Sequence, residues 1–368
     1  MPGVHREHMS PVRPLRRDDL PQVAALYETR LSGGRRARPG MVEHFDHQFL
    51  QAPTADPEIP SLVATDGAGH VIGFLGANVT PMTLDGRTVR AVATGPMFTE
   101  PDARLVSVLL LRSLLTGPQA FTFSDKHNLD AHRLFTRLGA RVVHPRYVWW
   151  EIALRPVEQW VSNTVSRRRR ALMPLLRPVA RLADGVSGRR RREVADVGTV
   201  VAVPLTPALA TEGLPELMGR ARLRPTYDEA FLAWRFAQLA LARRLGVLRA
   251  LALRDAEGAL VGWFVALIPD GGVATAVQVV ARDGSEGTVL QGLFDAADGG
   301  GAVAVRGRLE PELAFAMRGS GCTLHQRTCL LVHTDDDDVW RALTGDQAML
   351  TLLDGEPWLA EMHEGRQA

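Results

Sequence analysis

One segment in the first half of the chain constrains the fold more than any other. Residues 121–123 have the pattern of a strand, and Asn128 follows at the position of a helix N-cap. Gly139 stands where a helix ends in a left-handed residue. Between them, apolar residues recur at helical spacing: Leu129, Ala131, Leu134, Phe135 and Leu138. The segment therefore predicts a strand, a helix of about two and a half turns and a return to strand, a βαβ step of an α/β fold.

Length and charge limit the class of protein. With 368 residues the chain can form two domains, each with its own core. The 43 Lys and Arg residues nearly balance the 41 Asp and Glu residues, which argues against a nucleic-acid partner. Two cysteines are too few for a disulfide framework, and no apolar run has transmembrane length. We therefore expect a cytoplasmic protein without a transmembrane segment.

The rest of the first half alternates between segments with the apolar period of a strand and segments with the apolar period of a helix. Two β-rich runs flank the Gly-rich turn at residues 66–70, which predicts a hairpin. The other elements are expected as a strand at 12–15, a helix at 20–31, a strand at 88–98, a helix at 102–115 and a strand at 121–123. The predicted order is β-α-β-β-β-α-β-α-β.

The second half repeats this order. Residues 251–264 resemble residues 62–74, with a hairpin turn and a Gly-aromatic pair in both. The elements that follow are expected as a strand at 274–280, a helix at 288–297, a strand at 302–305, a helix at 311–318 and a strand at 327–332. We therefore predict an internal duplication.

The repeated pattern resembles the GNAT superfamily of N-acetyltransferases. The first half carries a strand, then Asn-x-x-Ala-x-x-Leu-aromatic, Gly-Ala and another strand, like the last βαβ step of that fold. Residues 225–236 resemble a segment of tandem GNAT proteins. The resemblance implies an α/β (α+β) fold with two tandem GNAT-like domains, each a mixed central sheet flanked by helices. We place the domains at residues 1–155 and 199–368, with an Arg-rich linker at 156–198.

The linker carries two arginine clusters, at residues 167–170 and 189–192. It can be a solvated basic connection, or it can dock an acidic acyl carrier protein or anionic lipid head groups. Few aromatic residues interrupt the arginines, which argues against stacking on RNA bases.

The resemblance implies an N-acyltransferase that moves an acyl group from acyl-CoA, or an acyl carrier thioester, to a small-molecule amine. Acetyl-CoA is one such donor. In the family, amides at a helix N-terminus hold the pyrophosphate, and a backbone amide of the fourth strand polarises the thioester carbonyl. The residues at the matching cofactor-binding positions are Met97, Phe98, Thr99, Arg104, Ser107, Asn128 and Phe135.

This chain departs from the family pattern at several positions. The glycines of the phosphate loop are missing, and the β-branched Val106 is expected to hinder close approach of a ligand to the backbone. Phe135 replaces a tyrosine general acid and cannot donate a proton. Glu100 is the carboxylate nearest the fourth strand, and His127 lies near the helix, so these two are our catalytic candidates.

Two other functions remain open. One is a catalytically degenerate GNAT-fold protein that binds a ligand or a protein. The other is a Fem-like aminoacyl-tRNA-dependent transferase. The acyl group, the acceptor and the oligomeric state are not encoded in these motifs.

Two further patterns have the residue types of ligand sites. His44 and His47 would share a helix face, but the sequence offers no third ligand beside them, so we expect no metal. Residues 282–288 contain two glycines and a serine before a helix, which fits either an anion-binding nest or a simple turn.

Overall fold

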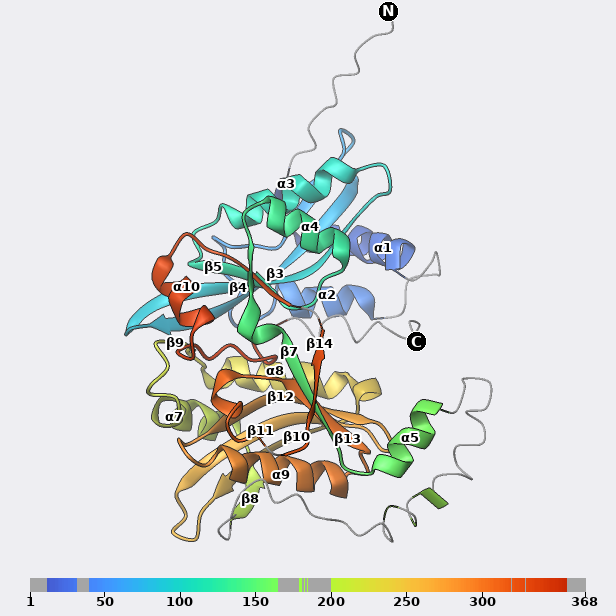
Figure 1. Ribbon diagram of the computed structural model, residues 1–368. Coiled ribbons are helices and arrows are strands. Elements are labelled where there is room, and N and C mark those ends of the chain that lie inside the picture. Colours follow the sequence, from blue (N-terminus) through green and yellow to red (C-terminus); the bar gives the residue numbers. More distant parts are fainter. Residues whose placement is uncertain are drawn as a thin grey trace, which may run out of the picture. The chain divides into compact units, whose positions relative to one another are not determined.

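A computed structural model describes residues 12–31, 40–164, 179–180, 182, 184, 200–318, 320–327 and 329–355 (Figure 1). Both arginine clusters of the predicted linker lie outside the described residues. The chain forms two compact units, one of residues 1–142 and 330–340 and the other of residues 143–329 and 341–368. Among the described helices, none combines the length and apolar character needed to cross a bilayer.

The sheet of the first unit has the strand order β1-β2-β3-β4-β5-β15-β6. The strands along this order are β1 (Val12–Pro14), β2 (Leu62–Thr65), β3 (Val71–Leu84), β4 (Arg87–Thr99), β5 (Phe121–Ser124), β6 (Arg141–Val143) and β15 (Leu330–His333). The sheet also includes β9 (Leu223–Pro225), which pairs with β3. β4 and β5 are parallel, whereas the hairpin strands β2, β3 and β4 pair antiparallel. This confirms the predicted mixed sheet.

Helices cover both faces of this sheet. They are α1 (Leu20–Leu31), α2 (Met41–Phe49), α3 (Arg104–Leu115) and α4 (Leu129–Arg137). Phe74 on β3 packs edge-to-face against Phe45 of α2, whereas a Cβ at the adjacent Gly73 would meet Val106 of α3. Because successive strand residues point to opposite faces, α2 and α3 lie on opposite sides of the sheet. The aromatic core on the α2 side comprises Tyr27, Phe45, Phe49, Phe74 and Phe98.

The sheet of the second unit has the order β14-β7-β13-β12-β11-β10-β8. Its strands are β7 (Val148–Ala153), β8 (Val201–Pro204), β10 (Val247–Arg254), β11 (Leu260–Ile268), β12 (Val273–Ala281), β13 (Ala304–Arg308) and β14 (Thr323–Gln326). The remaining elements are α5 (Pro156–Thr164), α7 (Pro207–Leu217), α8 (Glu229–Leu241), α9 (Glu286–Gly299) and α10 (Asp337–Thr344). Short 3-10 turns occur at Arg17–Asp19, His144–Tyr147, Arg243–Leu245 and Pro311–Leu313.

The same strand pattern recurs in both units. β12 pairs antiparallel with β11 and parallel with β13, just as β4 does with β3 and β5. A bulge interrupts each antiparallel ladder, at Val277 in β12 and opposite Gly76 in β4. The two sheets therefore share this arrangement of three strands.

Each sheet includes a strand from the other half of the chain. β7, drawn in green, lies between β13 and β14 in the sheet of the second unit (Figure 1). β15 pairs antiparallel with β5 in the first unit. The chain thus passes between the units more than once.

The predicted helix at 311–318 is wrong. Only Pro311–Leu313 forms a 3-10 turn, and turns follow it. Leu313 and Met317 are buried, whereas Phe315 is 82% exposed. Two buried side chains give little packing to hold a longer helix, and most helical stability comes from such packing.

Candidate functional site

The end of β4 in the first unit carries the first group of predicted site residues. β4 pairs with β5 only from Ala91–Phe121 to Ala93–Phe123 and then continues to Thr99. A bulge follows, because Gly76 of β3 stands opposite two β4 residues, Gly95 and Pro96. The strand is therefore kinked where it passes the end of β5.

Beyond this bulge lie Met97, Phe98, Thr99 and Glu100. Met97 and Thr99 are partly buried, and Glu100 is exposed. Phe98 is 6% exposed and packs against Tyr27 with ring centroids 5.5 Å apart. Its side chain belongs to the core, and its backbone faces β3, since Phe98 pairs with Phe74 one alternation away from the bonded pair Glu100–Ile72. Met97 and Thr99 are therefore left to present backbone N–H groups to a ligand.

The start of α3 holds the next two predicted residues. Arg104 is the first residue of the helix, and Ser107 is partly buried in its first turn. Val106 is 5% exposed and faces Gly73. The expectation that Val106 obstructs the loop is therefore wrong, because its side chain fills a gap against the sheet.

The start of α4 holds the third group. Asn128 Oδ1 accepts a hydrogen bond from the Ala131 backbone N–H at 2.8 Å, which makes Asn128 the N-cap as predicted. Phe135 is 3% exposed and packs into the core, so it presents no ring at the surface. The capping bond leaves the Asn128 side-chain N–H groups available to a ligand.

His127 precedes this cap and is partly buried. Burial, and then the neighbouring His132, lower the pKa of His127 to about 4. The imidazole is therefore neutral at pH 7, and it is a weak proton acceptor.

The three groups share one edge of the sheet. β4 and β5 are parallel neighbours, so the loops that follow them leave from the same end. In open α/β sheets, ligands bind at the carboxyl ends of the strands. The loop before α3 and the loop before α4 therefore form one candidate site in the first unit.

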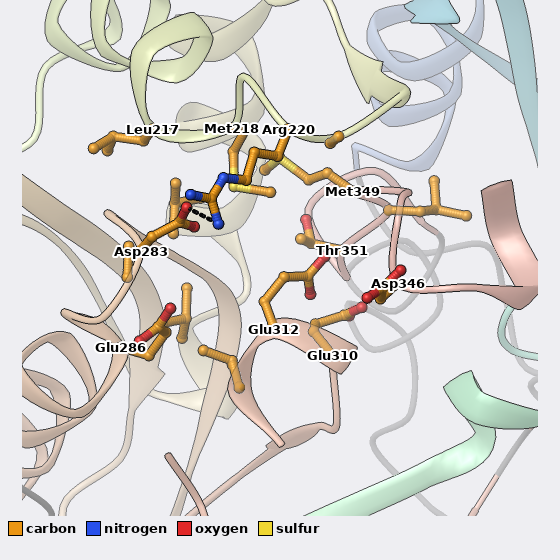
Figure 2. A pocket seen from close by; sticks show the side chains of 16 residues that line it. Leu217, Met218, Arg220, Asp283, Glu286, Glu310, Glu312, Asp346, Met349 and Thr351 are labelled. Atoms are coloured by element: carbon orange, nitrogen blue, oxygen red, sulfur yellow. Dashed lines mark ion pairs between the residues drawn. The ribbon is translucent and has the colours of Figure 1, made fainter. Parts of the chain in front are cut away.

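The second unit has a pocket at the matching place, beyond the bulge of β12 (Figure 2). It lies among the end of β12, the start of α9, the turn after β13 and residues 346–351. The lining includes the acidic residues Asp283, Glu286, Glu310, Glu312 and Asp346. Its volume of about 70 Å³ suits a small group and not a whole nucleotide.

Two of these carboxylates are paired with arginine. Asp283 forms an ion pair with Arg220 at 2.5 Å. Glu310 accepts hydrogen bonds from Arg146 and, at 2.9 Å, from Arg308 Nε. Both buried arginines also donate to the Leu350 carbonyl, so Glu310 anchors the wall of the pocket.

Glu312 is different, and Figure 2 shows it near the middle of the pocket. Burial, and then the charge of Glu310, raise the pKa of Glu312 to about 7; Arg146 lowers it, and Asp346 adds a small increase. Within the described part of the chain, its Oε1 has no hydrogen-bond partner. A carboxyl with this pKa can exchange a proton near neutral pH.

Sequence reasoning missed Glu312. The family resemblance points to a base near the fourth strand of the first half, and the apolar spacing predicts a helix at residues 311–318. The signal lay in the second copy of the repeat, two residues after Glu310, where a carboxylate follows the fifth core strand.

The predicted nest at residues 282–288 suits an anion poorly. The Gly284 N–H donates to Glu286 Oε1 at 3.1 Å. Asp283 of the same loop is paired with Arg220. Because Glu286 occupies one backbone donor of the loop, the loop of the second unit differs from an open phosphate cradle.

No family model matches the sequence, and no curated protein matches it either. Solved structures match the fold. A protein of Enterococcus faecalis described as a "Probable N-Acyltransferase" has a TM-score of 0.56 and 10% identity, over 88% of this chain and 72% of that chain. The chain has the fold of the GNAT acetyltransferases.

Other solved structures also match the fold. A GCN5-related N-acetyltransferase of Anabaena variabilis has a TM-score of 0.56 and 9% identity, over 89% of this chain and 73% of that chain. The N-myristoyltransferase of Saccharomyces cerevisiae with bound myristoylCoA has a TM-score of 0.52 and 10% identity, over 91% and 84%. These likenesses confirm the predicted GNAT fold.

Proposed function

We propose that the protein is an N-acyltransferase that moves an acyl group from acyl-CoA, or a related acyl thioester, to the amine of a small molecule. The observation that carries this proposal is the bulged β4 that passes the end of β5 in front of the α3 N-terminus. The acyltransferases with which the chain shares its fold support the same reaction class.

The donor is assigned to the first unit. Backbone N–H groups of Met97 and Thr99, which point away from β3, would polarise the thioester carbonyl, because amide dipoles stabilise charge that develops on oxygen. The first amides of α3, with Arg104 and Ser107, would bind the phosphates at the positive end of the helix dipole. Asn128 would donate a side-chain N–H to an amide carbonyl of the pantetheine arm.

The loop before α3 carries two acidic residues close to the proposed phosphate site. No ion pair of Glu100 or Asp102 appears among the described residues, and both side chains are exposed at the loop. Their charge weakens phosphate binding, so we expect donor affinity to come chiefly from the acyl and pantetheine parts. Acetyl-CoA, with the shortest chain, should then bind less tightly than longer acyl-CoAs.

The amine must lose its proton before it attacks. The neutral amine nitrogen then bonds to the carbonyl carbon, the carbon–sulfur bond breaks, and the thiolate leaves and takes up a proton. In the second unit, the acidic pocket would attract a cationic group by itself, and Glu312 there could exchange a proton near pH 7. Glu100 and His127, the bases proposed from sequence, are less suited, since Glu100 is exposed and His127 has a pKa of about 4.

Calorimetric titration with acetyl-, octanoyl- and palmitoyl-CoA tests the donor assignment. We expect a dissociation constant below the millimolar range for at least one donor, and weaker binding after Arg104→Ala. Arg112→Ala, in the last turn of the same helix, is the matched control and should bind normally. If all three donors fail to bind, the assignment is wrong.

Phe135 and the missing loop glycines favour a second function, a GNAT-fold protein that binds a thioester without turnover. That protein would bind acyl-CoA but release no thiol in the presence of any amine. The two functions therefore separate at the step of amine-dependent thiol release.

A further inference from the structure

Two histidines meet at the N-terminus of α4. His127 is the residue before the Asn128 cap, and His132 lies in the first turns of the helix. His127 Nε2 and His132 Nδ1 are 3.4 Å apart, and the rings are tilted by 37° with centroids 5.4 Å apart. The capping bond of Asn128 fixes the geometry of the loop that carries His127.

A cysteine lies beside this pair. Cys329 directly precedes β15, whose residue Leu331 pairs antiparallel with Ser124 of β5. Continuing this register places residue 329 beside residue 126, next to His127 along the chain. The position of Cys329 thus follows from the pairing of β15 with β5. The ligand atoms of His127, His132 and Cys329 all lie within 4.8 Å of one another.

These three groups are the ligand types that zinc prefers. Zinc binds imidazole nitrogen at about 2.0–2.1 Å and thiolate sulfur at about 2.3 Å in a tetrahedral arrangement. Two nitrogens bound in this way are separated by about 3.3–3.4 Å, the edge of the tetrahedron. The separation of the two histidine nitrogens is 3.4 Å.

We propose that His127, His132 and Cys329 bind one zinc ion, with a fourth position left to water or another small ligand. A hydrogen bond between the two imidazoles would give a similar nitrogen–nitrogen distance. It would not account for a cysteine sulfur beside both rings, however. The third group therefore favours a metal site.

The zinc would join the loop before α4 to the start of β15. It would thus tie a strand from the end of the chain to a helix from its first half. This role does not depend on acyl transfer, and it would replace the catalytic role that the sequence suggested for His127.

The test is metal content after zinc loading and removal of excess zinc from the full chain. We expect one equivalent in the wild type and a loss of that zinc after His132→Ala or Cys329→Ser. His325→Ala and Cys322→Ser are matched controls that should keep it, since His325 is exposed on β14 and Cys322 lies before that strand. A wild type without stoichiometric zinc, or a Cys329→Ser variant that keeps it, would overturn the proposal.

Cobalt replacement supplies a second readout that does not rely on variants folding. A cobalt ion bound by thiolate shows a sulfur-to-metal charge-transfer band and the strong visible bands of a tetrahedral site. We expect both in the wild-type protein. Bound cobalt without the charge-transfer band would exclude Cys329 as a ligand and contradict the site.

Discussion

The hydroxyl of Tyr227 donates a hydrogen bond to Asp354 Oδ1 at 2.6 Å, with both side chains buried in the second unit. Gln278 Nε2 donates to the same hydroxyl at 3.0 Å, and the Thr351 backbone N–H donates to Asp354 Oδ2 at 2.8 Å. Burial, and then the Asp354 charge, hold the pKa of Tyr227 well above its usual range. This network fastens residues 351–354 to β12 beside the acidic pocket.

Replacing Tyr227 tests the network. Tyr227→Phe removes the donor to Asp354 and leaves a buried carboxylate oxygen without that partner, so we expect a loss of about 1–3 kcal/mol in the free energy of unfolding. Urea denaturation measures it. Thr136→Ala is the control, because its hydroxyl bonds within an exposed helix, and it should change stability by less than about 0.5 kcal/mol. Equal effects of the two substitutions would contradict the network.

The bulge of β4 depends on a small residue opposite it. A Cβ at Gly76 would lie 2.6 Å from Cε1 of Phe49 and 3.2 Å from the Gly95 backbone. Gly76→Ala should therefore destabilise the protein by about 1–3 kcal/mol, measured by thermal or urea unfolding. Gly67→Ala is the matched control, because a Cβ there meets nothing within 4 Å. A Gly76→Ala variant as stable as Gly67→Ala would show that the strand accommodates the side chain.

The sequence predicted much of the fold because its helix, strand and turn patterns are local and occur in both halves. Asn128 was predicted as a cap, and the two Gly-aromatic hairpins pointed to a duplicated sheet, since periodicity and turn residues act locally. The sequence did not predict that β7 joins the sheet of the second unit and β15 the sheet of the first. The alternation of apolar residues marks a strand, but it does not show which of two similar sheets the strand joins. The prediction of a helix at 311–318 was wrong because too few of its side chains are buried to stabilise a helix by packing.

Two substitutions of Asn128 distinguish its role as a helix cap from a role in ligand binding. Asn128→Ala removes the cap of α4 and should cost about 1 kcal/mol of stability, whereas Asn128→Ser keeps a capping oxygen. If Asn128 also contacts the donor, Asn128→Ser should weaken acyl-CoA binding while leaving the unfolding midpoint nearly unchanged. Unaltered binding in a stable Asn128→Ser variant would reduce Asn128 to a cap.

Glu312 gives stability a defined pH dependence. Its pKa rises from 4.5 to about 7 on folding, so the folded state binds more protons than the unfolded state between these values. Stability from this group is therefore lost as the pH rises through that window, by up to about 3 kcal/mol. Urea denaturation from pH 4.5 to 8 should show this loss as a fall in wild-type stability relative to Glu312→Gln, because the lowered pKa values of His44 and His127 affect both proteins alike. Glu257→Gln, on an exposed turn, is the control and should follow the wild type.

The candidate site was readable only in part. Strand order placed Met97–Thr99, Arg104 and Asn128 at one sheet edge, as the resemblance implied. Burial decided the rest: Phe98 and Phe135 turned out to be core residues, and Glu312 became a candidate base through its surroundings. A pKa depends on neighbours brought together by the fold, which linear spacing does not give.

The most direct test of acyl transfer is amine-dependent release of thiol from acyl-CoA by the wild-type protein. A panel of donors from acetyl- to palmitoyl-CoA is combined with aliphatic and aromatic amines, and free thiol is followed beside mass spectrometry of the amine. The account predicts thiol release that saturates with amine concentration, together with an equal amount of acylated amine. Donor binding with no amine-dependent release from any pair would contradict it and leave a GNAT-fold binding protein.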